Sequence, residues 1–472
     1  MSDATGAPAP GSGGRAPERR MGLVTATALV IASMVGTGVF TTTGLLVELV
    51  PSAPAALLCW VVGGAMALCG ALSYAELGAA LPQNGGEYHF LSRLFHPCLG
   101  FLSAWVSLIV GFAAPLAAVA LAFGQYAAAF APGLSPRITG AVLIVVLSGV
   151  NAWRVSTSAG LQNVLTYAKV ALIVGFVATG AWFGTGSRLM AAEGPPVLPI
   201  LTSSGFAVGL LLVSFSYFGW NAAAYVAGEV RDPARVMPRS LALGTAVVLL
   251  LYVALNVVFF VAAPVSALAG KVEVGHVAAV ALLGPIGGRV ISAVVTLGLV
   301  STVGALIVTG PRVYEAVGTN VPRLSWLARR SDGGGPGLAI ALQSSLALVM
   351  LATAGFEALL TYIGFTLSVF SALTVMGVFV LRRRSDISIP FRTPGYPVTP
   401  LLFVALMVWR VAHAVVRRPV TAGLGAVTVL VGLGVYGFTA WRAAPRPGAD
   451  SARRTRPDDD SDESRREGDG AR

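Results

Sequence analysis

The chain has 472 residues, of which 55% are hydrophobic and only 11% are charged. Soluble domains average about 25% charged residues, so this composition excludes an ordinary soluble protein. The formal net charge of +11 does not indicate nucleic-acid binding, because most basic residues lie in short loops between apolar runs. The sequence therefore predicts an all-α polytopic membrane protein whose solvent is the lipid bilayer.

The first segment, 1–20, is rich in Gly, Pro, Ala and Ser, and we expect it to be a disordered cytoplasmic N-terminus. One apolar run follows another after it, so the first run is predicted to be a retained span rather than a signal peptide. No cysteine pair or histidine stands at the spacing of metal ligands, and no phosphate-binding GxxxxGK[ST] run occurs. We therefore predict no metal, no cofactor and no enzymatic activity.

Apolar segments long enough to cross a bilayer recur along the chain and define a predicted transmembrane domain, 21–442. The stretch 274–284 is expected to form a short interfacial helix. We predict twelve transmembrane helices, at about 22–46, 53–80, 99–130, 137–153, 160–184, 204–229, 239–264, 287–312, 337–354, 357–381, 398–417 and 421–442.

The distribution of Lys and Arg predicts the orientation of these helices. Sixteen basic residues lie in loops on the N-terminal side and six in the opposite loops. Positive loops stay in the cytoplasm, so both termini are predicted to be cytoplasmic in a cell membrane, plasma or inner. The tail 443–472 mixes seven Arg with eight acidic residues and almost no apolar ones, and it is predicted to be disordered.

Two predicted spans contain residues that interrupt a helix. The first contains Gly36-Thr37-Gly38, and the sixth contains Gly219 between large aromatic residues, followed by Asn221. Glycine in a helix interior costs about 1 kcal/mol relative to alanine. Irregular backbone at membrane depth survives where it lines a cavity, although the first motif alone would also suit tight helix packing.

A broken helix exposes peptide groups that can bind a charged solute. The half-helix after Gly38 would offer free N–H groups to a carboxylate, and the half-helix ending near Tyr217 would offer carbonyl groups to an ammonium. A zwitterionic amino acid matches both ends. Paired interruptions in corresponding spans indicate a transporter site and imply repeats of spans 1–5 and 6–10.

Lys169 lies inside the fifth predicted span, where a charge costs about 3 kcal/mol or more. At about 1.5 Å per residue, Lys169, Gly36, Gly219 and Ser301 all fall in the middle half of the bilayer core. Lys169 is expected to be a proton carrier or a fixed substitute for a coupling cation; snorkelling to the interface is the alternative. Ser301 and Thr302 could ligate sodium or bond back to their own helix, and a neighbouring ammonium favours sodium independence.

Four motifs in order resemble the amino acid–polyamine–organocation (APC) superfamily, over residues 20 to 440. The first motif is 32–40 in the first span, and the second is 73–78 followed by 82–88 at the end of the second span. The third is 215–221 followed by 228–233 in the sixth span, and the fourth is 301–302 followed by 309–312 in the eighth span. The resemblance implies a LeuT-type fold with a 5+5 inverted repeat, discontinuous helices 1 and 6, and two extra C-terminal helices. The repeats would cover about 22–184 and 204–381, and the extra helices 398–442.

The resemblance also implies which residues bind substrate and how the carrier works. The carboxylate would meet backbone N–H groups and the amino group would meet carbonyls, with Phe215 as a gate over the substrate. Transport would proceed by alternating access as a symporter or antiporter, and a lysine at position 169 is similar to that of proton-coupled or sodium-independent members. The expected substrate-binding residues are Met34, Gly36, Thr37, Gly38, Phe215, Ser216, Phe218 and Asn221.

The expected substrate is a neutral amino acid that is not large. Phe218 should narrow the pocket, and no acidic residue lies in the predicted middle of a span to pair with a cation. Glu76 and Glu229 lie near cytoplasmic ends and are expected to anchor a gate or loop, whereas Asn221 could bond substrate or cap the break. The alternatives are a carrier of cationic amino acids or polyamines, or a channel or carrier for another solute.

Overall fold

The computed structural model describes residues 21–36, 38–131, 133–153, 159–184, 196–320, 325–327, 329 and 337–441. The expectations for the termini, 1–20 and 443–472, lie outside these residues. Within the described part the chain is helical, apart from one isolated parallel bridge between Met21 and Val230. Eight of its helices are long and apolar enough to cross a membrane, and four further apolar helices are shorter.

The first half of the chain follows the predicted spans closely, except that a short helix forms in the loop after the second span. Its elements are α1 (Leu23–Met34), α2 (Gly38–Thr41), α3 (Thr43–Leu49), α4 (Ala53–Ala80), α5 (Glu87–Leu94), α6 (Pro97–Val106), the π-helix η1 (Ser107–Ala113), α7 (Ala114–Ala127), α8 (Pro136–Trp153) and α9 (Ala159–Phe183).

The second half begins with a short helix that leads into the sixth predicted span. Its elements are α11 (Val197–Leu201), α12 (Ser204–Tyr217), α13 (Ala222–Tyr225), the 3-10 helix η2 (Ala227–Glu229), α14 (Pro233–Ala262), α15 (Val265–Leu268), α16 (Val274–Asn320), α17 (Gly337–Thr353), α18 (Phe356–Leu381), α19 (Val398–Arg417) and α20 (Pro419–Trp441).

Helix α16 corrects the prediction for the eighth span. Its first part covers the segment 274–284, where a short separate helix was predicted, and its second part runs past the predicted end of the span at residue 312 to Asn320. A kink at Gly284, with φ +75°, separates its two parts. Pro285 follows the kink at a helix start, where its missing N–H would have no helical partner in any case.

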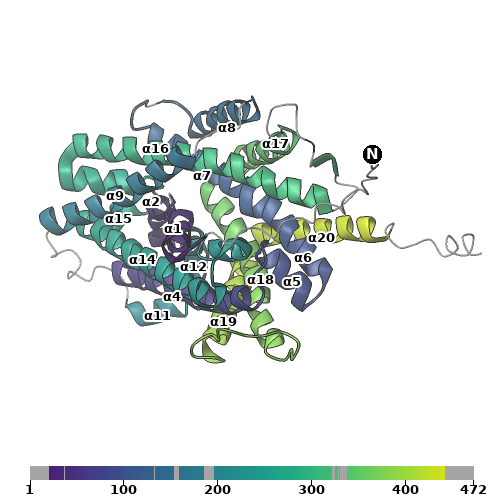
Figure 1. The fold of residues 1–472 in the computed structure, drawn as a ribbon. Coiled ribbons are helices and arrows are strands. Elements are labelled where there is room, and N and C mark those ends of the chain that lie inside the picture. The colour runs from purple at the N-terminus through teal and green to yellow at the C-terminus, as the bar shows by residue number, and fades with distance from the viewer. Residues whose placement is uncertain are drawn as a thin grey trace, which may run out of the picture.

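The interrupted helices lie in the middle of the molecule. Figure 1 shows α1, α2 and α12 surrounded by the longer helices, with α20 at the periphery. The rings of Trp60, Tyr217 and Tyr252 pack with centroids 5.3–5.8 Å apart and join α4, α12 and α14. Such aromatic contacts add about 0.5–1.5 kcal/mol each beyond their buried area. They hold α12, which ends at the second break, against α4 and α14.

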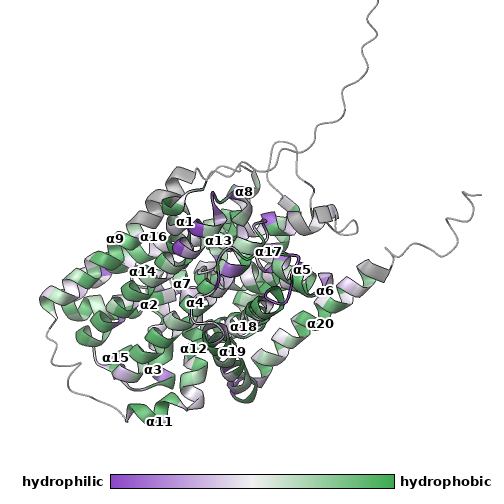
Figure 2. Ribbon diagram, turned by 60° about the horizontal axis from the view of Figure 1, so that its bottom comes forward, coloured by the Kyte–Doolittle hydropathy of each residue, from purple (hydrophilic) through white to green (hydrophobic). Residues whose placement is uncertain are grey.

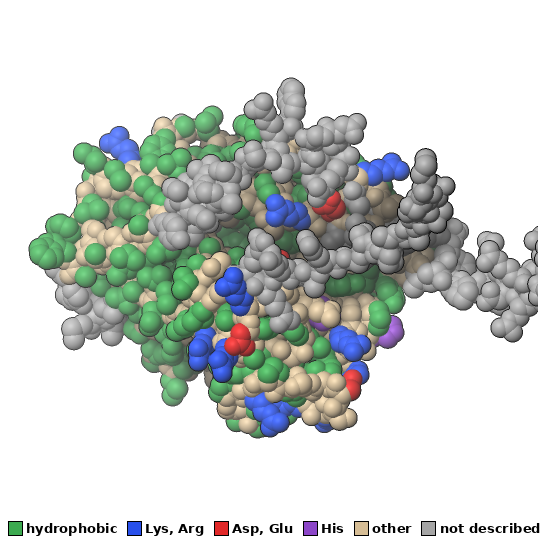
Figure 3. Space-filling model, viewed as in Figure 1, with side chains coloured by type: hydrophobic (Ala, Val, Ile, Leu, Met, Phe, Trp, Pro, Cys, Tyr) green, Lys and Arg blue, Asp and Glu red, His purple; other side chains and the backbone are tan. Residues whose placement is uncertain are grey.

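The outer surface is strongly apolar, as a bilayer requires. Val145, Leu250, Leu297 and Leu430 are 57–66% exposed. Hydrophobic side chains predominate on the left half of the face in Figure 3, and hydrophilic residues gather around α13 and α5 in Figure 2. The helices therefore present apolar side chains to lipid and collect their polar residues at one region of the molecule.

Candidate functional site

The predicted break in the first span is present. Helix α1 ends at Met34, Val35 has the non-helical ψ of 79°, and α2 begins at Gly38; Thr37 lies outside the described residues. The Met34 carbonyl oxygen accepts a hydrogen bond from the Gly36 N–H at 2.7 Å and another from the Tyr252 hydroxyl at 2.6 Å. Tyr252 of α14 therefore adds a second hydrogen bond to a carbonyl group that lacks the usual helical partner at the end of α1.

The predicted break in the sixth span is also present. Helix α12 ends at Tyr217, a turn follows over 218–221, and α13 begins at Ala222. Gly219 has φ +101°, a conformation that other residues rarely adopt. The glycine between aromatic residues that predicted the break is therefore the residue with the positive φ in the turn.

The two breaks face each other at closely packed glycines. A Cβ atom on Gly38 would lie 2.7 Å from the Ser216 Cα, and one on Gly219 would lie 2.6 Å from the Ser33 carbonyl carbon. The Ser216 hydroxyl donates a hydrogen bond to the Thr42 hydroxyl at 3.1 Å. The structure thus brings Gly38 and Ser216, two of the expected substrate-binding residues, into contact, and only glycine allows such a backbone approach.

Two aromatic residues of the second break, Phe215 and Phe218, pack against each other. The rings of Phe215 and Phe218 lie 6.5 Å apart in an edge-on arrangement. Phe218 lines a cavity of about 20 Å³, room for about one water molecule, whose walls come from the second break and from α4, α12, α18 and α19. None of its lining residues belongs to α1 or α2, so this cavity is not a space between the two breaks.

Lys169 contacts Thr302, which was expected to lie near it. Its ammonium donates a hydrogen bond to the Thr302 hydroxyl at 2.8 Å, and that hydroxyl donates to the Gly298 carbonyl at 2.9 Å. The Ser301 hydroxyl is buried without a partner among the described residues. Lys169 therefore joins α9 to α16, and no hydrogen bond within the described residues joins it to either break.

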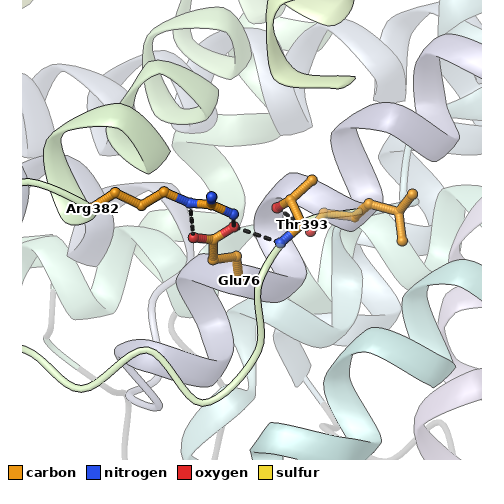
Figure 4. A network of polar contacts seen from close by, with 4 residues as sticks. Glu76, Arg382 and Thr393 are labelled. Atoms are coloured by element: carbon orange, nitrogen blue, oxygen red, sulfur yellow. Dashed lines mark hydrogen bonds and ion pairs between the residues drawn. The ribbon is translucent and has the colours of Figure 1, made fainter. Parts of the chain in front are cut away.

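Glu76 anchors the C-terminal end of α4, as Figure 4 shows. Its carboxylate accepts from the Arg382 guanidinium at 2.7 and 2.8 Å and from the Thr393 N–H at 2.7 Å. Glu229 accepts from the Asn84 side chain at 3.4 Å, and its carbonyl accepts from the Met21 N–H at 2.9 Å. Both contacts tie loops to helix ends, the arrangement expected of an anchor.

Asn221 makes a contact that the sequence did not reveal. It makes no side-chain cap hydrogen bond, so the interpretation as a cap is wrong. Its amide donates instead to the Glu87 carboxylate at 3.3 Å. Glu87 is only 5% exposed, and burial raises the pKa of its carboxyl. It lies within the motif 82–88, but its partners are distant in sequence, so its burial could not be foreseen.

A second residue that was overlooked is Arg410 of α19. The residue is 1% exposed, and its guanidinium donates to the Leu210 carbonyl and to the hydroxyls of Ser214 and Ser368. No acidic partner for it occurs in the part of the chain that the structure describes. The signal was available, because Arg410, like Lys169, lies well inside a predicted span.

Residues 21–435 match the family described as amino acid permease. The chain belongs to this family. It is accordingly a multi-pass membrane protein and an amino acid transporter of the APC superfamily, not an enzyme. The resemblance drawn from the four sequence motifs is confirmed.

Several curated relatives match over most of their length. The serine/threonine exchanger SteT of Bacillus subtilis (strain 168) is 27% identical over 89% of this chain and 96% of the relative. The large neutral amino acids transporter small subunit 2 of Homo sapiens is 28% identical over 94% and 85%. The cystine/glutamate transporter of Homo sapiens is 27% identical over 91% and 87%. These amino acid permeases carry substrates of different size and charge.

Proposed function

We propose that this permease carries small neutral amino acids by alternating access. The observation that supports it is the contact between the two breaks, where Gly38 approaches Ser216 and Gly219 approaches Ser33 deep inside an apolar bundle. The substrate carboxylate would bind N–H groups at Gly36, Thr37 and Gly38, and the amino group would bind carbonyls at Phe215, Ser216 and Phe218, beside Met34.

The proposed architecture has twelve spans. Eight long and four shorter apolar helices of the described residues supply that number, with a 5+5 inverted repeat over 22–184 and 204–381. Helices α19 and α20 lie outside the repeats, and both termini are cytoplasmic. The charge asymmetry of the loops supports this orientation.

Transport is proposed to be sodium-independent, by exchange or with protons. The Lys169 ammonium takes the Thr302 hydroxyl that a sodium ion would need as a ligand. A fixed positive charge there holds α9 to α16 as a coupling ion would.

Two residues at the second break bear on the proposed size and charge of the substrate. Phe218 is a large side chain at the turn of the second break and supports a substrate that is not large, in keeping with the exchanger of serine and threonine among the relatives. Glu87 favours the alternative of a cationic amino acid or polyamine, because its buried carboxylate bonds Asn221.

A competition panel decides between these substrates. Uptake of labelled serine into liposomes that contain the purified protein would be measured with and without sodium. Unlabelled neutral, cationic and acidic amino acids and polyamines would be added outside, one at a time, as competitors. We expect small neutral amino acids to compete best and sodium to have no effect. Preferential competition by arginine or by a polyamine would favour the alternative instead.

A further inference from the structure

Glu87 is a buried carboxylate at the meeting point of four elements. It begins α5, in the loop between the second and third spans. Its Oε1 atom accepts hydrogen bonds from the Tyr74 hydroxyl of α4 at 2.6 Å, from the Asn221 amide at 3.3 Å and from the Ser371 hydroxyl of α18 at 3.4 Å. One oxygen atom thus holds the turn of the second break against α4, α5 and α18.

The charge of this carboxylate is not neutralised by a cation. Among the described residues, no Lys, Arg or His forms an ion pair with Glu87. Glu76 gives the contrast, because Arg382 pairs with its carboxylate through two hydrogen bonds. The two buried acids therefore differ in their surroundings, because Glu76 is paired with a cation and Glu87 is surrounded by neutral donors.

The titratable groups that face Glu87 are tyrosines. Tyr74 of α4 and Tyr225 of α13 lie close enough to be influenced by its charge, and the other donors, Asn221, Ser371 and Ser103, do not titrate. Along its own helix, Glu87 is followed by His89 and Arg93. Burial raises the pKa of Glu87, and the hydrogen bonds from Tyr74 and the others oppose that rise without cancelling it.

We propose that Glu87 is a proton-binding site that controls the contact between the second helix break and the cytoplasmic side of the transporter. Ionised Glu87 accepts a charge-assisted hydrogen bond from Asn221 at 3.3 Å, which keeps the turn 218–221 against α5. A proton from water neutralises the carboxylate and weakens these bonds, so the turn is freed when the cytoplasmic side opens. The proton returns to water when the carboxylate ionises again.

This inference rests on the proposed transport function, which supplies the readout. Uptake of an amino acid that the wild type transports would be measured in liposomes with internal and external pH varied together. We expect a pH-dependent rate in the wild type and a flat profile in Glu87→Gln, whose amide resembles the protonated acid. Glu357→Gln is the matched control, because Glu357 pairs with Arg418 outside this cluster, and its profile should follow the wild type.

Two further variants test the same site without removing its carboxyl group. Tyr74→Phe and Ser371→Ala each remove a donor that favours the ionised form, so the pKa of Glu87 rises. The midpoint of the uptake profile should move to higher pH, by about one unit in Tyr74→Phe, since hydrogen bonds to charged groups contribute about 1.5–3 kcal/mol. The inference is wrong if Glu87→Gln keeps the wild-type pH profile. If Glu87→Gln does not fold, the inference is wrong when both Tyr74→Phe and Ser371→Ala keep the wild-type midpoint.

Infrared titration of the purified protein separates this inference from the transport proposal. A protonated carboxylic acid absorbs at its own frequency, and that band should appear in the wild type as pH falls and be reduced in Glu87→Gln. If the wild type takes up no amino acid but the band is present, the transport proposal fails and the proton site stands. Absence of a difference between the two proteins would overturn the proton site.

Discussion

Glycine residues decide how closely the two broken helices approach. Gly219 combines φ +101° with a Cβ position only 2.6 Å from the Ser33 backbone, so a side chain there faces both conformational strain and a clash. Gly38 meets Ser216 in a similar way. Such contacts cannot be relieved by rotating a side chain, because the nearest atoms belong to the backbone of Ser33 or to the Cα of Ser216.

We predict that Gly219→Ala lowers amino acid uptake more than tenfold per folded molecule. A residue other than glycine at this φ costs about 1–2 kcal/mol, and the added Cβ must push α1 away from the turn. Gly175→Ala is the matched control, since Gly175 lies in α9 with nothing within 4 Å of its Cβ position. Wild-type uptake by Gly219→Ala would show that the contact between the breaks is not required.

Lys169 supports a second prediction for a single residue. Lys169→Ala removes the ammonium that bonds the Thr302 hydroxyl and should lower uptake at least tenfold at every pH. A proton carrier would behave differently, because its removal would abolish the pH dependence as well. Lys271→Ala, in an exposed loop position, is the control. Full activity in Lys169→Ala with an unchanged pH profile would reject any role in coupling.

The helices were largely predictable because hydrophobic length and glycine interruptions are local properties of the sequence. The predicted spans 53–80, 337–354 and 398–417 agree with α4, α17 and α19 to within one residue. Both breaks were predicted from Gly36 and Gly219. The extent of α16 was not, because its helix continues through Pro311 and is supported by packing that a local pattern does not record.

The backbone breaks of the candidate site were predictable from the sequence. The side-chain contacts between residues distant in sequence were less so. Glu87 meets Asn221 and Ser371 across 134 and 284 positions of sequence. Nothing in the motif 82–88 distinguishes a buried glutamate from an exposed one. Arg410 could have been found, since a charge inside an apolar run is visible without a structure.

The ion pair between Glu76 and Arg382 should stabilise the junction of α4 with the end of α18. Arg382→Ala leaves a carboxylate with no exposed side-chain surface unpaired, and we expect a loss of about 3 kcal/mol in unfolding free energy. Thermal unfolding in detergent would measure it. Arg384→Ala removes an exposed pair with Asp386 at 3.9 Å and should change little; equal effects of the two substitutions would contradict this account.

The whole molecule is predicted to place both chain ends in the cytoplasm. A fluorescent protein fused after Arg472 should therefore be fluorescent in bacterial cells, and alkaline phosphatase at the same position should be inactive. The physical reason is the excess of Lys and Arg in loops on the N-terminal side, together with an even number of spans. Active phosphatase at the C-terminus would require an odd number of spans or the opposite orientation.

The central claim is that the facing breaks of the first and sixth spans bind a small zwitterion. Counterflow in liposomes tests it most directly, with unlabelled serine inside and labelled serine outside, at several pH values and without sodium. We predict saturable accumulation of label that unlabelled small neutral amino acids suppress and that Gly219→Ala abolishes. Uptake no greater than in protein-free liposomes, for serine and for every other amino acid tested, would contradict the account.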